Sequence, residues 1–234
     1  LGDHEHVFLF VPHHLIWDGW SFDLLYDEMS AAYKALLQGR DEGLAPLAIS
    51  YADYAVWHRQ WLGSPAYQVE LEYWKQRLLA EPSPRLWPAG RSQRTAPGDP
   101  GSAVPIHIDP ARTARLHELA RAAEATMSMV TTALFGAMVQ RLAGGGPVSI
   151  GIPVRGREAR EIEPVMGFFN NLVAVQWPVD EGRRMSDYVT DVRAGMLEVF
   201  AHQDVPFERL VQEPSLVPRF QQAGFYQVMF SFQD

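Results

Sequence analysis

Two adjacent histidines, His13 and His14, precede an aspartate and a glycine in the stretch FVPHHLIWDGWS at residues 10–21. Imidazole is well suited to proton transfer near neutral pH, because its unperturbed pKa is about 6.5. The spacing therefore indicates a candidate for acid–base chemistry. Asp18 is close enough in sequence to fix the local backbone or to meet a distant arginine. Gly19 would let the chain reverse sharply and let a ligand approach the backbone.

These residue types also fit two other kinds of site. One histidine beside one aspartate is more often a structural pair in the core, and such a pair alone is weak support for catalysis. A metal site is the other alternative, because His4 and His6 share one face of an expected strand and His14 lies nearby. The sequence has no cysteine, and His4 and His6 lie near the start of the chain. We therefore predict that there is no metal site.

The elements expected to hold the histidines are a strand, a tight turn and a helix. Residues 6–12 form a continuous apolar run, which is typical of a strand buried on both faces. Because adjacent strand residues point to opposite faces, only one of His13 and His14 can face a given cleft. Residues 21–39 have apolar side chains at helical spacing, and the glycine at position 39 predicts the helix end.

The rest of the chain alternates between helical and strand patterns, which predicts the α/β class with mixed sheets flanked by helices. Asp109 is expected to cap one helix and Ser128 the next, and residues 81–102 read as a long irregular connection. Helices are expected at 51–62, 67–78, 110–125, 129–143, 186–202 and 205–213, and strands at 103–108, 147–154, 171–179 and 226–233. The tryptophans at helical spacing, expected in the core, are Trp57, Trp61 and Trp74.

Composition excludes several classes of protein. The 234 residues are 47% hydrophobic and carry a formal net charge of −8, which suits one large domain or two small ones. The sequence has no basic tract and no cysteine, so we expect no nucleic-acid partner and no disulfide framework. No apolar run approaches the roughly 18 residues that a membrane helix requires. We expect a cytoplasmic protein with no membrane partner.

Several stretches carry a resemblance to a known family. HHLIWDGWS resembles the HHxxxDG signature of non-ribosomal peptide synthetase condensation domains and their acyltransferase relatives. The later motifs of that family are matched, in the same order, by SIGIPVRGRE, MGFFNNLVAV, HQDVPFERLV and YQVMFSFQ. The matches extend from residue 13 to residue 233 and so cover nearly the whole chain.

The resemblance implies a chloramphenicol acetyltransferase-like fold, in which two similar α/β lobes form a V-shaped pseudo-dimer with a channel between them. Residues 1–45 would then be the end of the N-terminal lobe, carrying the histidine motif, and residues 46–234 most of the C-terminal lobe. Members of the family are longer, so we expect the front of the first lobe and the tail after the last strand to be missing. Such a fragment would be inactive alone.

The implied reaction is amide formation by an acyltransferase. A donor acyl or peptidyl thioester arrives on an upstream peptidyl carrier protein, and the amine arrives as an aminoacyl thioester on a downstream one. The phosphopantetheine arms belong to these carriers, so the resemblance implies no intrinsic cofactor. It also implies a neighbouring adenylation domain and a role in secondary metabolism such as antibiotic biosynthesis.

Carried over residue by residue, the resemblance makes His14 the catalytic residue. Its imidazole would either accept the proton of the amine or orient the amine and stabilise developing charge. His13 would face away from the substrates and support the loop. Asp18 would be structural and pair with Arg157, with Arg155 as the less favoured partner, because a buried carboxylate needs such a charge.

The remaining candidates have weaker assignments. Asn170 and Asn171 are candidates for hydrogen bonding to the carrier arm, or they merely complete a strand end. Trp17 either lines the channel or only packs, and packing is the simpler interpretation. HQDVPFERLV contains acid–base residue types, but it also reads as the start of a helix, and we interpret it as structural.

Other functions occur within the same superfamily. Epimerisation domains share the histidine motif but tend to continue it differently, and DGWSFD and PVRGR favour condensation. Heterocyclising relatives replace the histidines with a D-x4-D pattern, which is absent. Another acyl transfer is a further alternative. From a different class, a relative of this fold can be a non-catalytic docking platform that recruits a tailoring enzyme. The intact histidine motif favours a catalytic domain.

Overall fold

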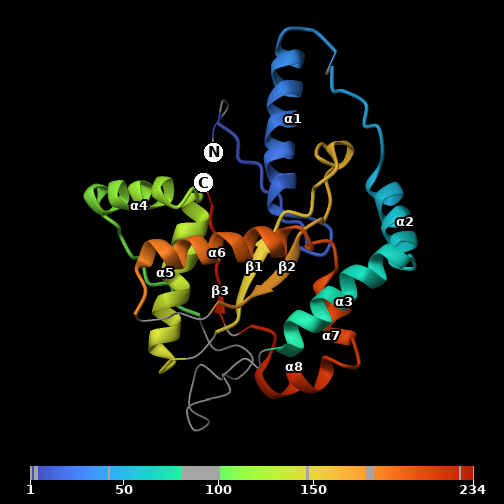
Figure 1. The fold of residues 1–234 in the computed structure, drawn as a ribbon. Helices are drawn as coiled ribbons and strands as arrows, with labels where there is room; N and C mark the ends of the chain where they lie inside the picture. Colours follow the sequence, from blue (N-terminus) through green and yellow to red (C-terminus); the bar gives the residue numbers. More distant parts are fainter. Residues whose placement is uncertain are drawn as a thin grey trace. The chain divides into compact units, whose positions relative to one another are not determined.

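The computed structural model describes residues 2, 5–41, 43–80, 101–145, 148–177, 182–226 and 228–233 (Figure 1). The chain forms two compact units. Unit 1 comprises Leu1–Tyr67 and Arg155–Asn171, and unit 2 comprises Gln68–Val154 and Leu172–Asp234. The predicted lobe boundary near residue 45 stays a prediction.

Unit 1 is built on the helix that follows the histidines. Helix α1 spans Gly19–Leu37, and Asp18 is its N-cap, whose side chain accepts a hydrogen bond from the Ser21 backbone N–H. Such a cap satisfies one of the otherwise unpaired N–H groups of the first turn. Gly39 follows the helix with a φ of 64°, which is the left-handed conformation that commonly ends helices. The predicted helix and its end are therefore confirmed.

A second helix of unit 1 packs on the segment at residues 155–169. Helix α2 spans Tyr51–Trp61 and begins with a capping box formed by Ser50 and Asp53. A short 3-10 helix, η1, spans Arg160–Ile162. The buried side chains of this unit include Ile162, Val165 and Phe169, and they are covered by Ile49, Tyr51 and Tyr54.

The apolar run before the histidines is not the buried strand that its sequence predicts. Residues 6–12 have no strand assignment, and Val7, Leu9 and Val11 are each more than 70% exposed. A strand needs neighbouring strands to accept its backbone hydrogen bonds and to cover its side chains. Among the described residues, no strand of the assigned sheet pairs with this run.

Unit 2 contains a three-stranded sheet with the order β2-β1-β3. Strand β1 spans Ile150–Val154, β2 spans Asn171–Val175 and β3 spans Val228–Met229. Strands β1 and β3 are parallel, with Ile150 opposite Val228. Most of β1 and the second half of β2 are buried, so the sheet forms part of the core, as predicted for strands in an α/β domain.

Helices pack against this sheet and against one another (Figure 1). Helix α5 contacts β1 and α6 at Gly136, where a side chain would lie 3.3 Å from both Ile150 and Tyr188. The inward face of α6 is fully buried at Val189, Val192 and Val199. The helices are α3 (Pro65–Ala80), α4 (Pro110–Ala122), α5 (Met127–Leu142), α6 (Met185–Phe200), α7 (Phe207–Gln212) and α8 (Val217–Ala223).

Several other sequence predictions need correction. Residues 103–108 have no strand assignment, and Val104 and Ile106 are more than 80% exposed. Thr126, not Ser128, caps α5, because its hydroxyl accepts from the Met129 backbone N–H. Helix α8 was not predicted, and most of the connection at 81–102 lies outside the described residues.

The predicted tryptophan cluster is only partly a core. Trp74 is 1% exposed, and its indole N–H donates to the His202 carbonyl at 2.7 Å. Trp61 is partly buried. Trp57 is 56% exposed, because α2 directs Tyr51 and Tyr54 towards the core and has no fully buried residue. Helical spacing alone therefore identified the helix but not its buried face.

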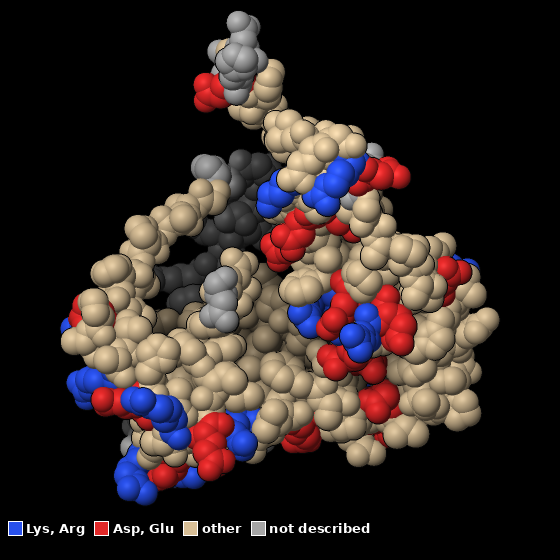
Figure 2. Space-filling view, turned by 90° about the horizontal axis from the view of Figure 1, so that it is seen from above, with Lys and Arg blue, Asp and Glu red and all other residues tan. Residues whose placement is uncertain are grey.

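On the face shown in Figure 2, acidic and basic side chains lie interspersed among uncharged ones. Within the described residues, no group of three or more histidine, cysteine, aspartate or glutamate residues could hold a metal ion, and His4 lies outside that part of the chain. No single described helix is long and apolar enough to cross a membrane. Helices α4 and α5 reach the required length and apolar composition only when taken together, and they are bent by 105° where they meet.

Candidate active site

The histidine motif borders a pocket in unit 1. The loop before α1 exposes His14, and the pocket has a volume of about 220 Å³. Its walls are mostly apolar, and they are formed by Pro12, His14, Trp17, Asp18, Gly19 and Phe22. An exposed imidazole beside a mostly apolar pocket is accessible to a reacting group, which a core histidine is not. His14 is therefore not buried in a core, and its catalytic role stays a prediction.

The hydrogen bond of His14 decides which ring nitrogen can act as a base. Its Nδ1 lies 2.7 Å from the Trp17 carbonyl oxygen. Because a carbonyl only accepts hydrogen bonds, Nδ1 must carry the proton and donate it. The neutral imidazole then has its lone pair on Nε2. The ring also makes an edge contact with Phe168, with the ring centres 5.5 Å apart and the planes at 83°.

His13 has a different role in the same loop. It is exposed, and its Nδ1 accepts a hydrogen bond of 3.1 Å from the Leu15 backbone N–H. The His13 carbonyl also accepts from the Ile16 backbone N–H at 3.0 Å. His13 is not among the residues that line the pocket. These contacts shape the turn between the apolar run and α1.

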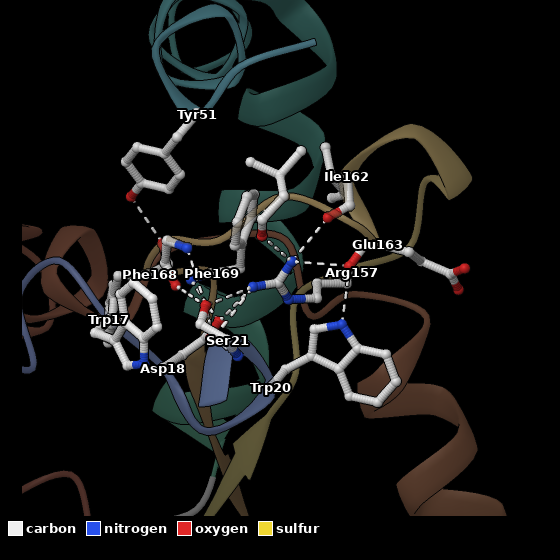
Figure 3. Close-up of polar contacts among 12 residues, drawn as sticks. Trp17, Asp18, Trp20, Ser21, Tyr51, Arg157, Ile162, Glu163, Phe168 and Phe169 are labelled. Atoms are coloured by element: carbon white, nitrogen blue, oxygen red, sulfur yellow. Dashed lines mark hydrogen bonds and ion pairs between the residues drawn. The ribbon is translucent and has the colours of Figure 1, made fainter. Parts of the chain in front are cut away.

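Asp18 is the centre of a buried hydrogen-bond network (Figure 3). Its Oδ1 accepts from the backbone N–H and the hydroxyl of Ser21, at 2.8 and 2.6 Å. Its Oδ2 accepts from the Phe169 backbone N–H at 3.1 Å. The carboxylate thus caps α1 and also binds a backbone group 151 residues away in sequence.

Arg157 is the charged partner of Asp18, as the sequence predicted. Its Nη2 lies 3.0 Å from Oδ2 of Asp18, and neither side chain is exposed. Its Nη1 donates to the carbonyl oxygens of Ile162 and Val165, both at 2.7 Å (Figure 3). The guanidinium also lies over the Phe169 ring, with Cζ 4.0 Å from the ring centre. One arginine therefore holds the helix cap and the 155–169 segment together.

Burial and charge act in opposite directions on this arginine. Burial lowers the pKa of Arg157, and the neighbouring Asp18 carboxylate opposes that effect. An arginine starts from such a high pKa that it keeps its charge at neutral pH. The pair is therefore a buried ion pair whose geometry is completed by the Ser21 hydroxyl, 3.3 Å from Nη2.

Arg155, the alternative partner, is directed elsewhere. Its guanidinium lies over the Trp20 ring at 4.4 Å and 4.0 Å from the Glu163 carboxylate. The Trp20 indole N–H donates to the Glu163 carbonyl at 2.8 Å. These contacts link the start of α1 to the 155–169 segment at the partly exposed edge of the network.

Glycines let the 155–169 segment approach its neighbours closely. Gly156 has a φ of +61°, and a side chain there would lie 2.1 Å from the Phe169 carbonyl oxygen. A side chain at Gly167 would lie 2.2 Å from the Tyr51 ring. Gly19 is different, because a side chain there would meet no atom within 4 Å. Its φ is outside the left-handed region, so the sharp reversal expected of Gly19 does not require glycine.

Two positioning groups escaped the sequence analysis. Ser21 is completely buried, and its hydroxyl lies 2.9 Å from both the N–H and the carbonyl oxygen of Gly167. The Tyr51 hydroxyl donates to the Phe168 carbonyl at 2.7 Å (Figure 3). Both bond to distant backbone groups, and no local sequence pattern marks such a bond.

The remaining predicted residues are placed as follows. Trp17 both packs and lines the pocket, since its ring contacts Phe10 and Phe22 at centre distances of 5.1 and 5.7 Å. Asn170 and Asn171 are half-buried at the start of β2 and are not among the residues that line the pocket.

The HQDVPFERLV stretch is structural in unit 2. Its histidine, His202, bonds to the Glu70 carboxylate at 2.7 Å and stacks on the Tyr73 ring at 3.7 Å. Its buried leucine, Leu210, lies in α7. These contacts join α3 to the end of α6, which fits the packing role expected from the sequence.

Comparison with known proteins identifies the family of this chain. A family model described as the condensation domain matches residues 1–234. The chain belongs to the condensation domain family. It is 35% identical over 234 residues to malpibaldin synthetase of Mortierella alpina, a match that covers 100% of this chain and 4% of that protein.

Solved structures show the same fold. The X-domain from teicoplanin biosynthesis superposes with a TM-score of 0.79 at 26% identity, over 93% of this condensation-domain chain and 49% of that one. The first condensation domain of the CDA synthetase superposes with a TM-score of 0.74 at 24% identity, over 95% and 48% of the two chains. The teicoplanin X-domain has also been solved in complex with OxyB.

These matches confirm the predicted α/β fold with its chloramphenicol acetyltransferase-like arrangement of sheet and helices. The chain spans about half the length of the solved relatives and a few per cent of the curated synthetase it matches.

Proposed function

We propose that this chain is part of a catalytic condensation domain of a non-ribosomal peptide synthetase. The domain joins a carrier-bound acyl or peptidyl thioester to the amine of a carrier-bound aminoacyl thioester. The observation that carries the proposal is the exposed His14 imidazole beside the pocket, with Nδ1 bonded to the Trp17 carbonyl and its lone pair on Nε2. Such a nitrogen is available to the proton of an attacking amine.

In the proposed reaction the amine nitrogen attacks the thioester carbonyl carbon. The C–N bond forms, the C–S bond breaks, and the amine proton passes to Nε2 of His14 and then to the departing thiolate. While the ring is charged, its Nδ1–H still donates to the Trp17 carbonyl. Nε2 can alternatively orient the amine through a hydrogen bond without taking its proton. In both versions, tethering of the reactants provides the proximity.

The remaining residues act on the position of His14. Asp18 and Arg157 support the loop, His13 shapes the turn, and Gly19 leaves room beside the pocket. Trp17, Asn170 and Asn171 are proposed to meet the substrates or the carrier arms.

The partners follow from the same proposal. They are upstream and downstream peptidyl carrier proteins, which supply the phosphopantetheine arms, and a neighbouring adenylation domain. No cofactor of its own is needed for the reaction. A cytoplasmic location and a role in antibiotic biosynthesis or other secondary metabolism are part of the proposal.

The test is the His14→Ala substitution in the complete synthetase that contains this chain. Peptide formation from preloaded carriers should fall by about 10²- to 10⁴-fold, which is the usual contribution of a general base. Loading of the carriers should not change. His107→Ala is a matched control, because His107 is exposed in unit 2. Unchanged peptide formation by the His14 variant would refute the proposal.

A non-catalytic docking platform is the second candidate function. The similarity to the teicoplanin X-domain, which has been solved in complex with OxyB, favours it. A platform would bind a tailoring enzyme equally well with or without the His14 side chain, and the unsubstituted synthetase would form no peptide bond at this domain. Epimerisation or another acyl transfer would instead show up as a changed product of the same assay.

A further inference from the structure

The His14 ring is held from two sides. On one side Nδ1 donates to the Trp17 carbonyl, and on the other the ring meets the Phe168 ring in an edge-to-face arrangement. An exposed imidazole with a single hydrogen bond can rotate about its bond to Cβ. The Phe168 contact restricts that rotation, because edge-to-face aromatic pairs prefer a narrow range of geometries.

Phe168 is itself fixed by hydrogen bonds to its own carbonyl oxygen and from the next backbone N–H. Its carbonyl oxygen accepts the Tyr51 hydroxyl at 2.7 Å, and the next residue, Phe169, donates its N–H to Asp18. The Tyr51 ring packs against Phe169, with ring centres 5.1 Å apart. Gly167 gives that ring its space, because a side chain there would overlap it. Hydrogen bonds at its carbonyl oxygen and at the next backbone N–H therefore hold Phe168, whose ring contacts His14.

We propose that Phe168 is a positioning residue that sets the orientation of the His14 imidazole, and that the Tyr51 hydroxyl holds Phe168 in place through its backbone carbonyl. Helix α2 thereby contributes to the active site although none of its residues lines the pocket. The inference rests on the proposed role of His14 for its effect on catalysis. Its effect on ring orientation is independent of that role.

The first experiment measures the His14 ring itself. Nitrogen NMR of the histidine-labelled chain at about pH 8, above the ordinary imidazole pKa, reports which nitrogen carries the proton. In the unsubstituted chain, His14 should be the tautomer protonated at Nδ1. Phe168→Ala should give averaged nitrogen shifts from several ring orientations. Tyr51→Phe, which removes one hydroxyl and leaves the ring, should move the shifts in the same direction by a smaller amount.

The second experiment measures turnover in the complete synthetase. Phe168→Ala should lower kcat for peptide formation by about 3- to 10-fold, as the loss of one aromatic pair predicts. KM for the acceptor carrier should change little, because the pocket walls remain. Phe168→Tyr keeps the ring and should retain most of the activity. Tyr33→Phe, at an exposed tyrosine of α1, is the matched control for Tyr51→Phe.

The outcomes separate this inference from the proposed function. The Phe168→Ala variant must first unfold at the same temperature as the unsubstituted chain. If its His14 nitrogen shifts and its kcat are then both unchanged, the inference is wrong. A change in the His14 shifts together with full activity of His14→Ala would instead refute the catalytic role of His14 and leave the positioning role of Phe168 standing.

Discussion

The Asp18 carboxylate and the Arg157 guanidinium approach to 3.0 Å although 139 residues separate them in the sequence, and both side chains are completely buried. Asp18 caps α1 directly after the histidine loop. Arg157 holds the carbonyl oxygens of Ile162 and Val165 in the segment that carries Phe168. The ion pair is therefore the connection through which two distant motifs of the condensation domain form one site.

Removal of either charge should destabilise unit 1 strongly. Asp18→Asn and Arg157→Met each leave a buried charge without its partner, which typically costs about 3–5 kcal/mol. Urea unfolding of the two variants measures the loss. The double variant should lose less than the sum of the two, because the residues share one network. Strict additivity would mean that the two side chains do not interact. Arg155→Met, at a half-exposed arginine, should cost about 1 kcal/mol or less.

Substitution of Gly19 should separate stability from activity. Gly19→Ala places a methyl group where no atom lies within 4 Å, in the first turn of α1. Alanine favours the helix by up to about 1 kcal/mol over glycine, so the free energy of unfolding should stay equal or increase. The methyl group borders the pocket, so peptide formation should fall. An alanine variant that is destabilised by more than about 1 kcal/mol would contradict this account.

Gly156→Ala should have the opposite profile. Its φ of +61° disfavours any side chain, and the new methyl group would lie 2.1 Å from the Phe169 carbonyl oxygen. We expect a loss of about 2 kcal/mol or more, measured by chemical denaturation. Gly63→Ala is the matched control, because its nearest contact would be an ordinary 3.5 Å.

Unfolding at high pH should depend on Tyr188. Burial raises the pKa of Tyr188 from 10.0 to about 12. The folded state thus keeps this proton at pH values where the unfolded chain has lost it. The stabilisation is complete below pH 10 and is lost as the pH rises towards 12. Stability measured across this range should fall less steeply in Tyr188→Phe than in the parent. The remaining slope includes Tyr73, whose pKa is also raised to about 12 by burial.

The helices could be predicted from the sequence because their signals are local. Asp109, helical spacing and the glycine after α1 each act within one or two turns. The two strand errors, at residues 6–12 and 103–108, have a shared cause. An apolar run predicts that a strand is possible, but a strand also needs partner strands to accept its backbone hydrogen bonds, and a local run does not specify them.

The candidate site was predictable where a motif carried it. The histidines, Asp18 and Arg157 stood in recognisable stretches, and the structure brings Asp18 and Arg157 together. Ser21 and Tyr51 were missed because their partners are backbone groups 146 and 117 residues away. Asn170 and Asn171 do not line the pocket, and their assignment to the substrate channel stays a prediction.

The separation of Asp18 from Arg157 also has a consequence for biosynthesis. A ribosome adds about 5–20 residues per second, so Asp18 is incorporated roughly 7–28 seconds before Arg157. During that interval the Asp18 carboxylate lacks the guanidinium that it pairs with in the folded structure. A chaperone that binds the emerging chain would therefore meet the unpaired carboxylate, and translation pauses before residue 157 would prolong that interval.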